Sequence, residues 1–338
     1  MSGEAPVGKE RPLPDGPQIT LVTVVIEKHY PYIQDQLDLI DALNPGAPFK
    51  LLVVDNAASA TGGLSSADPR VRLVAGFDPA PLPLEGRGSY HHALALNKAA
   101  RLVDTRYMLV MDPDFFVIRP GWIDACISHV EARGLSFFGA PWHYLSYRKW
   151  RYFPCVHFLL IDLEKVSAAE LDFTPAIVED RRWLNSAAAR WLKKYLPRLY
   201  NRSLVESRRD TGWRLRRLRG RRASEVLQPV LSIERELRAP KHLRHERGRS
   251  FERLLPRRWS YLPAPGSYVE PEVAPEFQRG EFEQLRPEMF AWRGEAFAFH
   301  MRRNMRDKTK GRTDDDTRKD EAALGGLLAR VRAGGRLG

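Results

Sequence analysis

Residues 18–112 alternate between strand-like and helix-like patterns of apolar side chains, and this alternation restricts the fold more than any other feature of the chain. Residues 19–26 (ITLVTVVI) are dense in β-branched side chains and predict a buried strand. Apolar residues near a helical spacing follow at 32–43. The same patterns predict strands at 49–54, 71–75 and 107–111 and a helix at 91–103. Such alternation is typical of a Rossmann-like α/β fold, a mainly parallel mixed sheet flanked by helices.

The rest of the chain adds further strands and a long basic region. Strands are predicted at residues 135–140, 157–161 and 296–300. We expect residues 167–220 to be mostly helical and basic, residues 240–275 to be irregular because they are rich in Pro and Arg, and residues 322–331 to form a small amphipathic helix. Residues 1–17, rich in Pro, Gly and charge, are expected to form a flexible segment.

Composition limits the setting in which this chain works. Hydrophobic residues make up 43% of the sequence, as in a globular protein, and no apolar stretch is long enough to cross a bilayer. The N-terminal segment lacks the hydrophobic core of a signal peptide, which argues against export. Cys126 and Cys155 are the two cysteines, and neither belongs to a CxxC pair, which favours a reducing compartment over a disulfide framework or structural zinc. We therefore expect a cytoplasmic protein, with peripheral membrane contact left open.

The charge of the chain points to anionic partners. The formal net charge is +12, and the excess is concentrated between Arg181 and Arg258. Nucleotides, nucleic acids and acidic membrane surfaces are the partners that such a balance suits.

Two carboxylates follow the predicted strand at 107–111, in the sequence Asp112-Pro113-Asp114. Ligands of open α/β sheets bind at the carboxyl ends of the strands. Two acids one residue apart, on a link stiffened by proline, can hold a hard divalent cation through oxygen ligands. The alternative is an ordinary turn, since Asp and Pro are common turn formers.

Other polar residues stand near the same predicted edge. Asp55 and Asn56 end the strand at 49–54, where an acid can accept hydrogen bonds from a nucleobase or ribose, or form an Asx turn or helix cap. Asn97 and Lys98 lie within the helix that precedes the acidic pair. His300 ends the strand at 296–300, and a neutral imidazole is a reasonable third ligand for a metal held by two carboxylates, although a lone histidine is more often structural.

The order of these segments resembles that of the family-2-like nucleotide-sugar glycosyltransferases, which have the glycosyltransferase A fold. The matching stretches are ITLVTVVIE, LLVVDNA, HHALALNKAARLVDTRYMLVMDPDFFV, HFLLIDLEKV, RDTGWRLRR and AFAFHMRRN. The resemblance implies a catalytic domain at 18–304, in which 181–275 form a basic, partly irregular insertion on the acceptor side, and a charged C-terminal tail at 305–338 with a short helix. It also implies a metal-dependent, inverting transfer of a sugar from a nucleoside-diphosphate sugar to a hydroxyl of a glycan, a lipid-linked or a small-molecule acceptor.

The resemblance implies roles for the residues on the donor side. Asp112 and Asp114 stand at the family's DxD motif, which binds Mn²⁺ or Mg²⁺ on the donor diphosphate, and His300 matches the histidine that completes this metal site. Asp55 stands where the family contacts the base or ribose. The donor-binding set that we predict also includes Glu27, Asn56, Asn97, Lys98, Arg302, Arg303 and Lys308.

The acceptor side is less well defined. An inverting transfer needs a general base, which in the family is an Asp followed by a segment like WRLRR. Asp210 precedes such a segment and is preferred, while Asp180, in a Glu-Asp pair at a more usual distance from HFLLIDL, is the alternative. Trp142, His143 and Tyr144 stand where the family builds its acceptor site, and a hydrophobic packing cluster is the other interpretation of these residues.

Two other functions remain open at this point. The first is a nucleic-acid-binding protein, favoured by Trp183, Trp191, Tyr195 and Trp213 among the arginines of the basic region. No RNP or zinc-finger motif accompanies them, and contact with an anionic membrane accounts for the same charge. The second is a nucleotidyltransferase, although Ile26-Glu27-Lys28-His29 does not look like the Gly-rich loop of that class.

Overall fold

The computed structural model describes residues 16–57, 65–76, 87–143, 152–175, 187–195, 210–230, 277, 280–285, 287–301 and 314–334. Residues 1–15 and most of the predicted insertion at 181–275 therefore lie outside the described residues.

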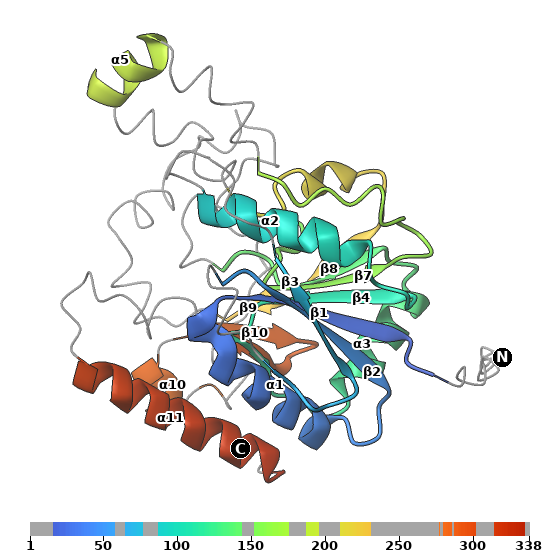
Figure 1. Cartoon of the computed structure of the whole chain (residues 1–338), viewed down its shortest axis with the longest axis vertical. Helices are drawn as coiled ribbons and strands as arrows, with labels where there is room; N and C mark the ends of the chain where they lie inside the picture. Colours follow the sequence, from blue (N-terminus) through green and yellow to red (C-terminus); the bar gives the residue numbers. More distant parts are fainter. Residues whose placement is uncertain are drawn as a thin grey trace, which may run out of the picture.

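A seven-stranded sheet with the order β3-β2-β1-β4-β7-β6-β8 forms the centre of the molecule (Figure 1). Its strands are β1 (Ile19–Val25), β2 (Phe49–Asp55), β3 (Val71–Ala75), β4 (Tyr107–Met111), β6 (Phe137–Gly139), β7 (Phe158–Asp162) and β8 (Ser224–Val226). Strands β3, β2, β1 and β4 are parallel, whereas β7 runs antiparallel to both β4 and β6. The predicted fold class, α/β with a mainly parallel mixed sheet flanked by helices, is confirmed.

The helices cover both faces of this sheet. In β1, Leu21 belongs to the same core cluster as α1 (Tyr30–Leu43), whereas its neighbour Val22 belongs to the cluster of α2 (Arg87–Ala100). Because successive strand residues face opposite sides, both faces must be apolar, and this explains the uninterrupted apolar run of β1. A further helix, α3 (Trp122–Ala132), joins the cluster of α1 and was not anticipated from the sequence.

A second sheet has the order β5-β11-β10-β9. Its strands are β5 (Phe115–Val117), β9 (Gln228–Pro229), β10 (Glu288–Trp292) and β11 (Glu295–His300). The predicted strand at 296–300 is β11, whereas β10 was not predicted. Arg293 and Gly294, both with positive φ (55° and 77°), make the two-residue turn between β10 and β11, as type I′ hairpins require.

The C-terminal helix is longer than predicted. Residues 322–331 are the second half of α11 (Asp314–Arg332), which buries Leu324, Leu327 and Leu328 in the core cluster of α1. Figure 1 shows α11 in red alongside α1, with the short helix α10 (Gly280–Leu285) next to it. Arg332 also forms an ion pair with Asp38 of α1 at 2.7 Å.

The prediction of a mostly helical region at 167–220 is wrong for the residues that the structure describes. Residues 167–175 form turns and extended chain, and the segment at 210–222 contains turns and the 3₁₀ helix η2 (Leu215–Leu218); α5 (Ala187–Tyr195) is helical. The Asp172 carboxylate accepts a hydrogen bond from the Thr174 amide, which is a turn contact that competes with helix formation. Among the described helices, none is long and apolar enough to cross a membrane.

Candidate metal centre

Asp112 begins a tight turn between the two sheets. Strand β4 ends at Met111 and β5 begins at Phe115, whose amide donates to the Asp112 carbonyl at 3.1 Å. Gln36 of α1 braces this turn from behind, because its Nε2 donates to the carbonyls of Asp112 (2.9 Å) and Phe115 (3.1 Å). Both contacts are with the backbone, and the Asp112 side chain, 17% exposed, faces the site.

His157 lies opposite Asp112 because β4 and β7 are antiparallel. The last pair of their ladder is Met111 with Phe158, and one residue further the Asp112 amide donates to the His157 carbonyl at 2.9 Å. The imidazole of His157 is buried, and its Nε2 is 3.7 Å from Asp112 Oδ2.

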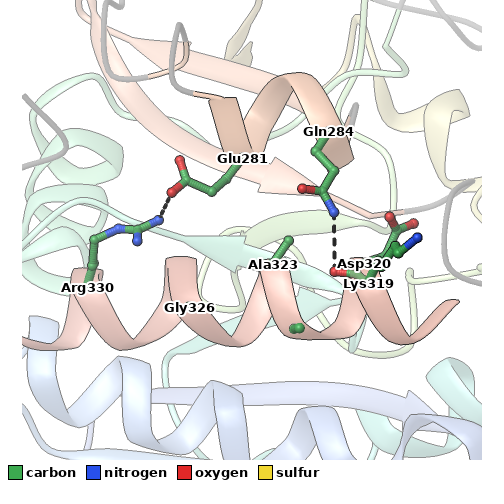
Figure 2. Close-up of a pocket in the computed structure, with 8 residues that line it drawn as sticks. Glu281, Gln284, Lys319, Asp320, Ala323, Gly326 and Arg330 are labelled. Atoms are coloured by element: carbon green, nitrogen blue, oxygen red, sulfur yellow. Dashed lines mark hydrogen bonds and ion pairs between the residues drawn. The ribbon is translucent and has the colours of Figure 1, made fainter. Parts of the chain in front are cut away.

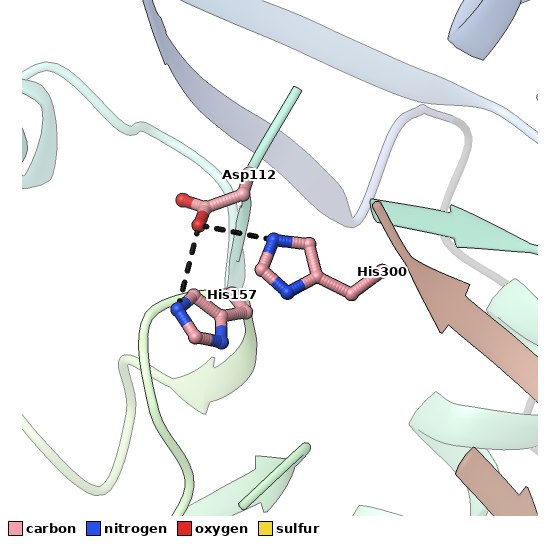
Figure 3. A group of neighbouring side chains, drawn as sticks. All are labelled: Asp112, His157 and His300. Carbon is pink, nitrogen blue, oxygen red and sulfur yellow. Dashed lines mark ion pairs between the residues drawn. The ribbon is translucent and has the colours of Figure 1, made fainter. Parts of the chain in front are cut away.

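His300 reaches the same point from the second sheet. It is the last residue of β11 and pairs with Phe115 of β5, while the next amide, that of Met301, donates to the Asp114 carbonyl at 3.0 Å. The His300 Nε2 is 3.2 Å from Asp114 Oδ1 and 3.7 Å from Asp112 Oδ2. Figure 3 shows the side chains of Asp112, His157 and His300 converging from three segments, and their potential ligand atoms all lie within 4.8 Å of one another.

A further layer of contacts orients both imidazoles. His300 Nδ1 is 3.2 Å from Oε2 of Glu288, which is 3% exposed and is the cross-strand partner of His300 on β10. His157 Nδ1 is 3.2 Å from the buried Sγ of Cys155. With Nδ1 occupied in each ring, Nε2 is the nitrogen that faces Asp112, as in carboxylate–histidine–metal arrangements.

The electrostatics of the centre favour a cation. Burial opposes ionisation of His300, but the carboxylates of Asp114 and Glu288 outweigh it and raise the pKa of His300 to about 10. His92 of α2, with its Nε2 3.8 Å from Asp112 Oδ1, behaves differently: burial lowers its pKa to about 4 despite the nearby Asp114. Positive charge is thus stabilised where His300 meets the acids.

The available donor atoms could hold a divalent metal ion. Carboxylate oxygens suit Mg²⁺ and Mn²⁺, whereas imidazole nitrogens suit first-row transition metals. A set with one or two carboxylates and two imidazoles fits Mn²⁺ better than Mg²⁺. Of the predicted metal ligands, the structure brings together Asp112, Asp114 and His300, and it adds His157, which sequence reasoning missed. The position of His157 directly before strand β7 was the available sequence signal. It was not sufficient, because β7 pairs with β4, which is distant in the sequence.

Asp55 and its neighbours lie at the carboxyl ends of β1 and β2. Asp55 Oδ2 accepts a hydrogen bond from the Tyr30 hydroxyl at 2.6 Å, and its Oδ1 accepts one from the Ala57 amide at 2.9 Å, as in an Asx turn. Asn56 Nδ2 donates to the His91 carbonyl at 3.2 Å. Glu27 is exposed in the 3₁₀ helix η1 (Glu27–His29) after β1.

Asn97 and Lys98 contact neighbouring backbone. Asn97 Oδ1 accepts a hydrogen bond from the Phe173 amide at 3.0 Å, and Lys98 Nζ donates to the Ala75 carbonyl of β3 at 2.6 Å. These contacts tie α2 to the segments on either side of it and do not reach Asp112.

The two predicted acceptor residues that the structure describes are packed inside. Trp142 is 3% exposed and meets the His157 ring edge-on, with centroids 4.5 Å apart. His143 is 1% exposed, contacts the Val230 carbonyl at 3.2 Å and packs on Phe290. Their burial agrees with the interpretation of these residues as a hydrophobic packing cluster. Trp142 packs against the His157 ring and so helps to fix its position.

Asp210 lies close to the first turn of α2. It is 9% exposed, and the hydroxyl of the next residue, Thr211, donates to the Ser89 carbonyl at 2.9 Å. His92, one turn along α2 from Ser89, faces Asp112. The N-terminal part of α2 thus connects the Asp210 segment with the candidate metal centre. Several predicted site residues lie outside the described residues: Tyr144, Asp180, Arg302, Arg303 and Lys308.

A groove elsewhere in the molecule is lined by charged and small residues of α10 and α11 (Figure 2). An ion pair joins Arg330 to Glu281 across it, and Gln284 Nε2 donates to the Lys319 carbonyl at 3.3 Å. No predicted site residue lines this groove.

Comparison with known proteins shows resemblance at the level of solved structures. No family model matches the chain, and no curated protein matches it. Galactosyltransferase LgtC, solved with donor and acceptor sugar analogs, is 14% identical over 66% of this chain and 79% of its own, with a TM-score of 0.39. Mannosyltransferase PcManGT from Pyrobaculum calidifontis, solved with GDP-Man and Mn²⁺, is 17% identical over 46% of this chain and 48% of its own (TM-score 0.33). S. aureus TarS, solved with UDP-GlcNAc, is 10% identical over 46% and 48% of the two chains, respectively (TM-score 0.30). The chain thus spans about half the length of the last two structures.

Proposed function

We propose that this chain is a metal-dependent glycosyltransferase, which moves a sugar from a nucleoside-diphosphate sugar to an acceptor hydroxyl with inversion. The observation that carries the proposal is the convergence of Asp112, Asp114, His157 and His300 at the carboxyl end of β4. This is the edge of an α/β sheet where ligands bind, and the sequence stretches around it resemble the family-2-like glycosyltransferases.

The donor would bind across the ends of β1, β2 and β4. Asp112, Asp114, His157 and His300 would hold Mn²⁺, or less well Mg²⁺, which supplies positive charge to the leaving diphosphate. Asp55, already aimed by Tyr30 and the Ala57 amide, retains lone pairs on both oxygens that can accept from a ribose hydroxyl or a base. Glu27 and Asn56, at the same strand ends, complete the proposed nucleotide side.

Asp210 is the proposed general base. It is buried at the start of the segment that packs on α2, where Thr211 contacts Ser89. A carboxylate in such a place can take the proton of an acceptor hydroxyl as the sugar is transferred. Asp180 remains the alternative. The acceptor is proposed to be a glycan, a lipid-linked sugar or a small molecule. Both cysteines are buried and neither forms a disulfide, which fits the cytoplasmic location expected from the sequence.

Calorimetric titration of nucleoside diphosphates, with and without Mn²⁺, tests the donor site. We expect metal-dependent binding by the wild type and loss of the metal dependence in Asp114→Ala. Glu295→Ala, at the exposed far end of β11, is the matched acidic control and should bind as the wild type does. Equal binding by Asp114→Ala in the presence of metal would refute the assignment.

Turnover of a nucleotide sugar by Asp210→Asn and Asp180→Asn, measured separately, tests the base. We expect Asp210→Asn to bind the donor normally and to lose turnover. Retained turnover in Asp210→Asn together with its loss in Asp180→Asn would transfer the role to Asp180.

The other two functions predict different outcomes. A nucleotidyltransferase would release pyrophosphate from a nucleoside triphosphate in the same metal-containing assay. A nucleic-acid-binding protein would bind oligonucleotides without metal and with steep salt dependence.

A further inference from the structure

Helix α5 carries the two most exposed aromatic side chains among the described residues. Trp191 is 55% exposed and Tyr195 is 56% exposed. They are four residues apart, so they lie on one face of the helix, and their ring centroids are 5.6 Å apart. Figure 1 shows α5 at the edge of the molecule, away from both sheets. An exposed Trp–Tyr pair on a peripheral helix calls for an explanation other than core packing.

A row of cations flanks this aromatic row. Arg190 and Lys194 each precede one of the aromatic residues, are exposed, and are themselves four residues apart. The Lys194 ammonium lies 5.0 Å from the centroid of the Tyr195 ring. No acidic residue occurs in the sequence of α5 (AAARWLKKY), and residues 181–205 around it also contain none.

We propose that the face of α5 formed by Arg190, Trp191, Lys194 and Tyr195 docks on an anionic phospholipid surface. Trp and Tyr favour the headgroup level of a bilayer, where the ring is buried and the polar atom stays wet. Arginine and lysine beside them extend to lipid phosphates, and an amphipathic helix that combines the two lies in the plane of the interface. The sequence of residues 181–205 is basic throughout, which adds to the attraction that an anionic surface exerts on this part of the chain.

The geometry favours a lipid surface over a single-stranded nucleic acid. A base would need an open aromatic face on which to stack. Trp191 and Tyr195 contact each other at an interplanar angle of 44°, and Lys194 lies over the Tyr195 ring. Because the two rings contact each other, they form one exposed apolar patch, which suits insertion between headgroups.

Co-sedimentation of the full chain with lipid vesicles tests the proposal without any sugar donor, so its result is independent of the proposed transferase activity. We expect binding to phosphatidylcholine vesicles that contain phosphatidylglycerol, and little binding to phosphatidylcholine alone. Trp191→Ser with Tyr195→Ser should lower the partition coefficient by about tenfold or more. Arg190→Ala with Lys194→Ala should lower it by about 25-fold, since each cation near an anionic surface contributes about fivefold.

Matched controls separate this face from general effects. Ile26→Ser removes the third exposed large apolar side chain among the described residues, and Arg318→Ala with Lys319→Ala removes the same charge from α11. We expect Ile26→Ser to leave vesicle binding unchanged and the α11 variant to lower it far less than the α5 cation variant does. Thermal unfolding of every variant should match that of the wild type, because the altered side chains are exposed.

Three outcomes would overturn the proposal. The first is equal binding to neutral and anionic vesicles. The second is vesicle binding that survives both α5 double substitutions. The third is an absence of binding to anionic vesicles by the wild type. If the same substitutions then abolish oligonucleotide binding or convert a dimer into a monomer, the face belongs to nucleic acid or to a second copy of the chain.

Discussion

His157 stands directly across the β4–β7 ladder from Asp112, and the Asp112 amide donates to the His157 carbonyl at 2.9 Å. This backbone bond holds the two side chains on the same side of the site, with His157 Nε2 3.7 Å from Asp112 Oδ2. The position of His157, a proposed metal ligand that sequence reasoning missed, is therefore set by strand register rather than by a local motif.

Replacing His157 should weaken metal binding. His157→Ala removes one of the two imidazoles that favour a transition metal, so we expect the affinity for Mn²⁺ to fall by about tenfold or more. Substitution of residues that only hydrogen-bond to metal ligands already causes losses of this size. The preference for Mn²⁺ over Mg²⁺ should narrow as well. Calorimetric titration of both ions measures each effect. His143→Gln, another buried histidine outside the cluster, is the control; equal losses in both variants would contradict a ligand role for His157.

Glu288 should act through His300. Its carboxylate contacts His300 Nδ1 at 3.2 Å, which directs Nε2 towards Asp112 and Asp114. We expect Glu288→Gln to lower Mn²⁺ affinity by about ten- to hundredfold, because groups that orient a ligand typically have effects of this size. Glu295→Gln, at the exposed start of β11, the strand that ends at His300, should leave the affinity for Mn²⁺ unchanged. Unchanged Mn²⁺ affinity in Glu288→Gln would show that the contact is only structural.

Gln36 should contribute to both stability and metal binding. Gln36→Leu removes the donors to the Asp112 and Phe115 carbonyls. The Asp112 carbonyl keeps the Phe115 amide as a donor, whereas the buried Phe115 carbonyl loses its side-chain partner, so the substitution should lower the free energy of unfolding by about 1–3 kcal/mol. The loosened turn should also bind Mn²⁺ less tightly. Urea unfolding and metal titration measure the two effects. Gln34→Leu on the exposed face of the same helix is the control, and a loss of stability no larger than in that variant would contradict the bracing role.

Asp172 should make stability depend on pH. Burial opposes its ionisation, but hydrogen bonds from Thr174 and Arg214 outweigh it and hold the pKa of Asp172 below its usual value. A lowered pKa in the folded state stabilises the protein above the unfolded-state pKa of about 3.9, and this contribution is lost as the pH falls through the folded-state value. Asp172→Asn should therefore be less stable than the wild type at neutral pH.

Urea unfolding at neutral pH and at a pH below the usual Asp range checks this expectation. The stability difference between Asp172→Asn and the wild type should shrink on acidification. Asp104→Asn, which removes an ion pair with the exposed Lys50, is the comparison. We expect it to lower the free energy of unfolding without changing turnover. Asp172→Asn should change both, because Asp172 pairs with Arg214, close to Asp210 in the sequence. A difference that stays constant with pH would rule out the ionised carboxylate as the cause.

Much of the fold was predictable from local patterns. The apolar run of β1 and the helical spacing of α1 are patterns among neighbouring residues. These patterns are pronounced because both faces of a parallel sheet are buried under helices. Helix α3 and strand β10 were missed because their buried residues pack on segments that are distant in the sequence: Trp122 of α3 meets Phe158 of β7, and Trp292 of β10 meets His129 of α3. The helical interpretation of 167–175 was wrong because the Asp172 carboxylate and the Asn97 side chain bind the backbone amides there.

By itself, the sequence determined that two carboxylates follow a buried strand and that a histidine ends a later one, because short apolar runs and the residues that close them are local features. Only the tertiary structure decided that Asp112 meets His157 and His300. These residues are 45 and 188 positions from Asp112, respectively, and their approach depends on the antiparallel register of β7 and on the pairing of β11 with β5. Pairing between distant strands depends on how whole elements pack, and no local pattern around a single histidine records it.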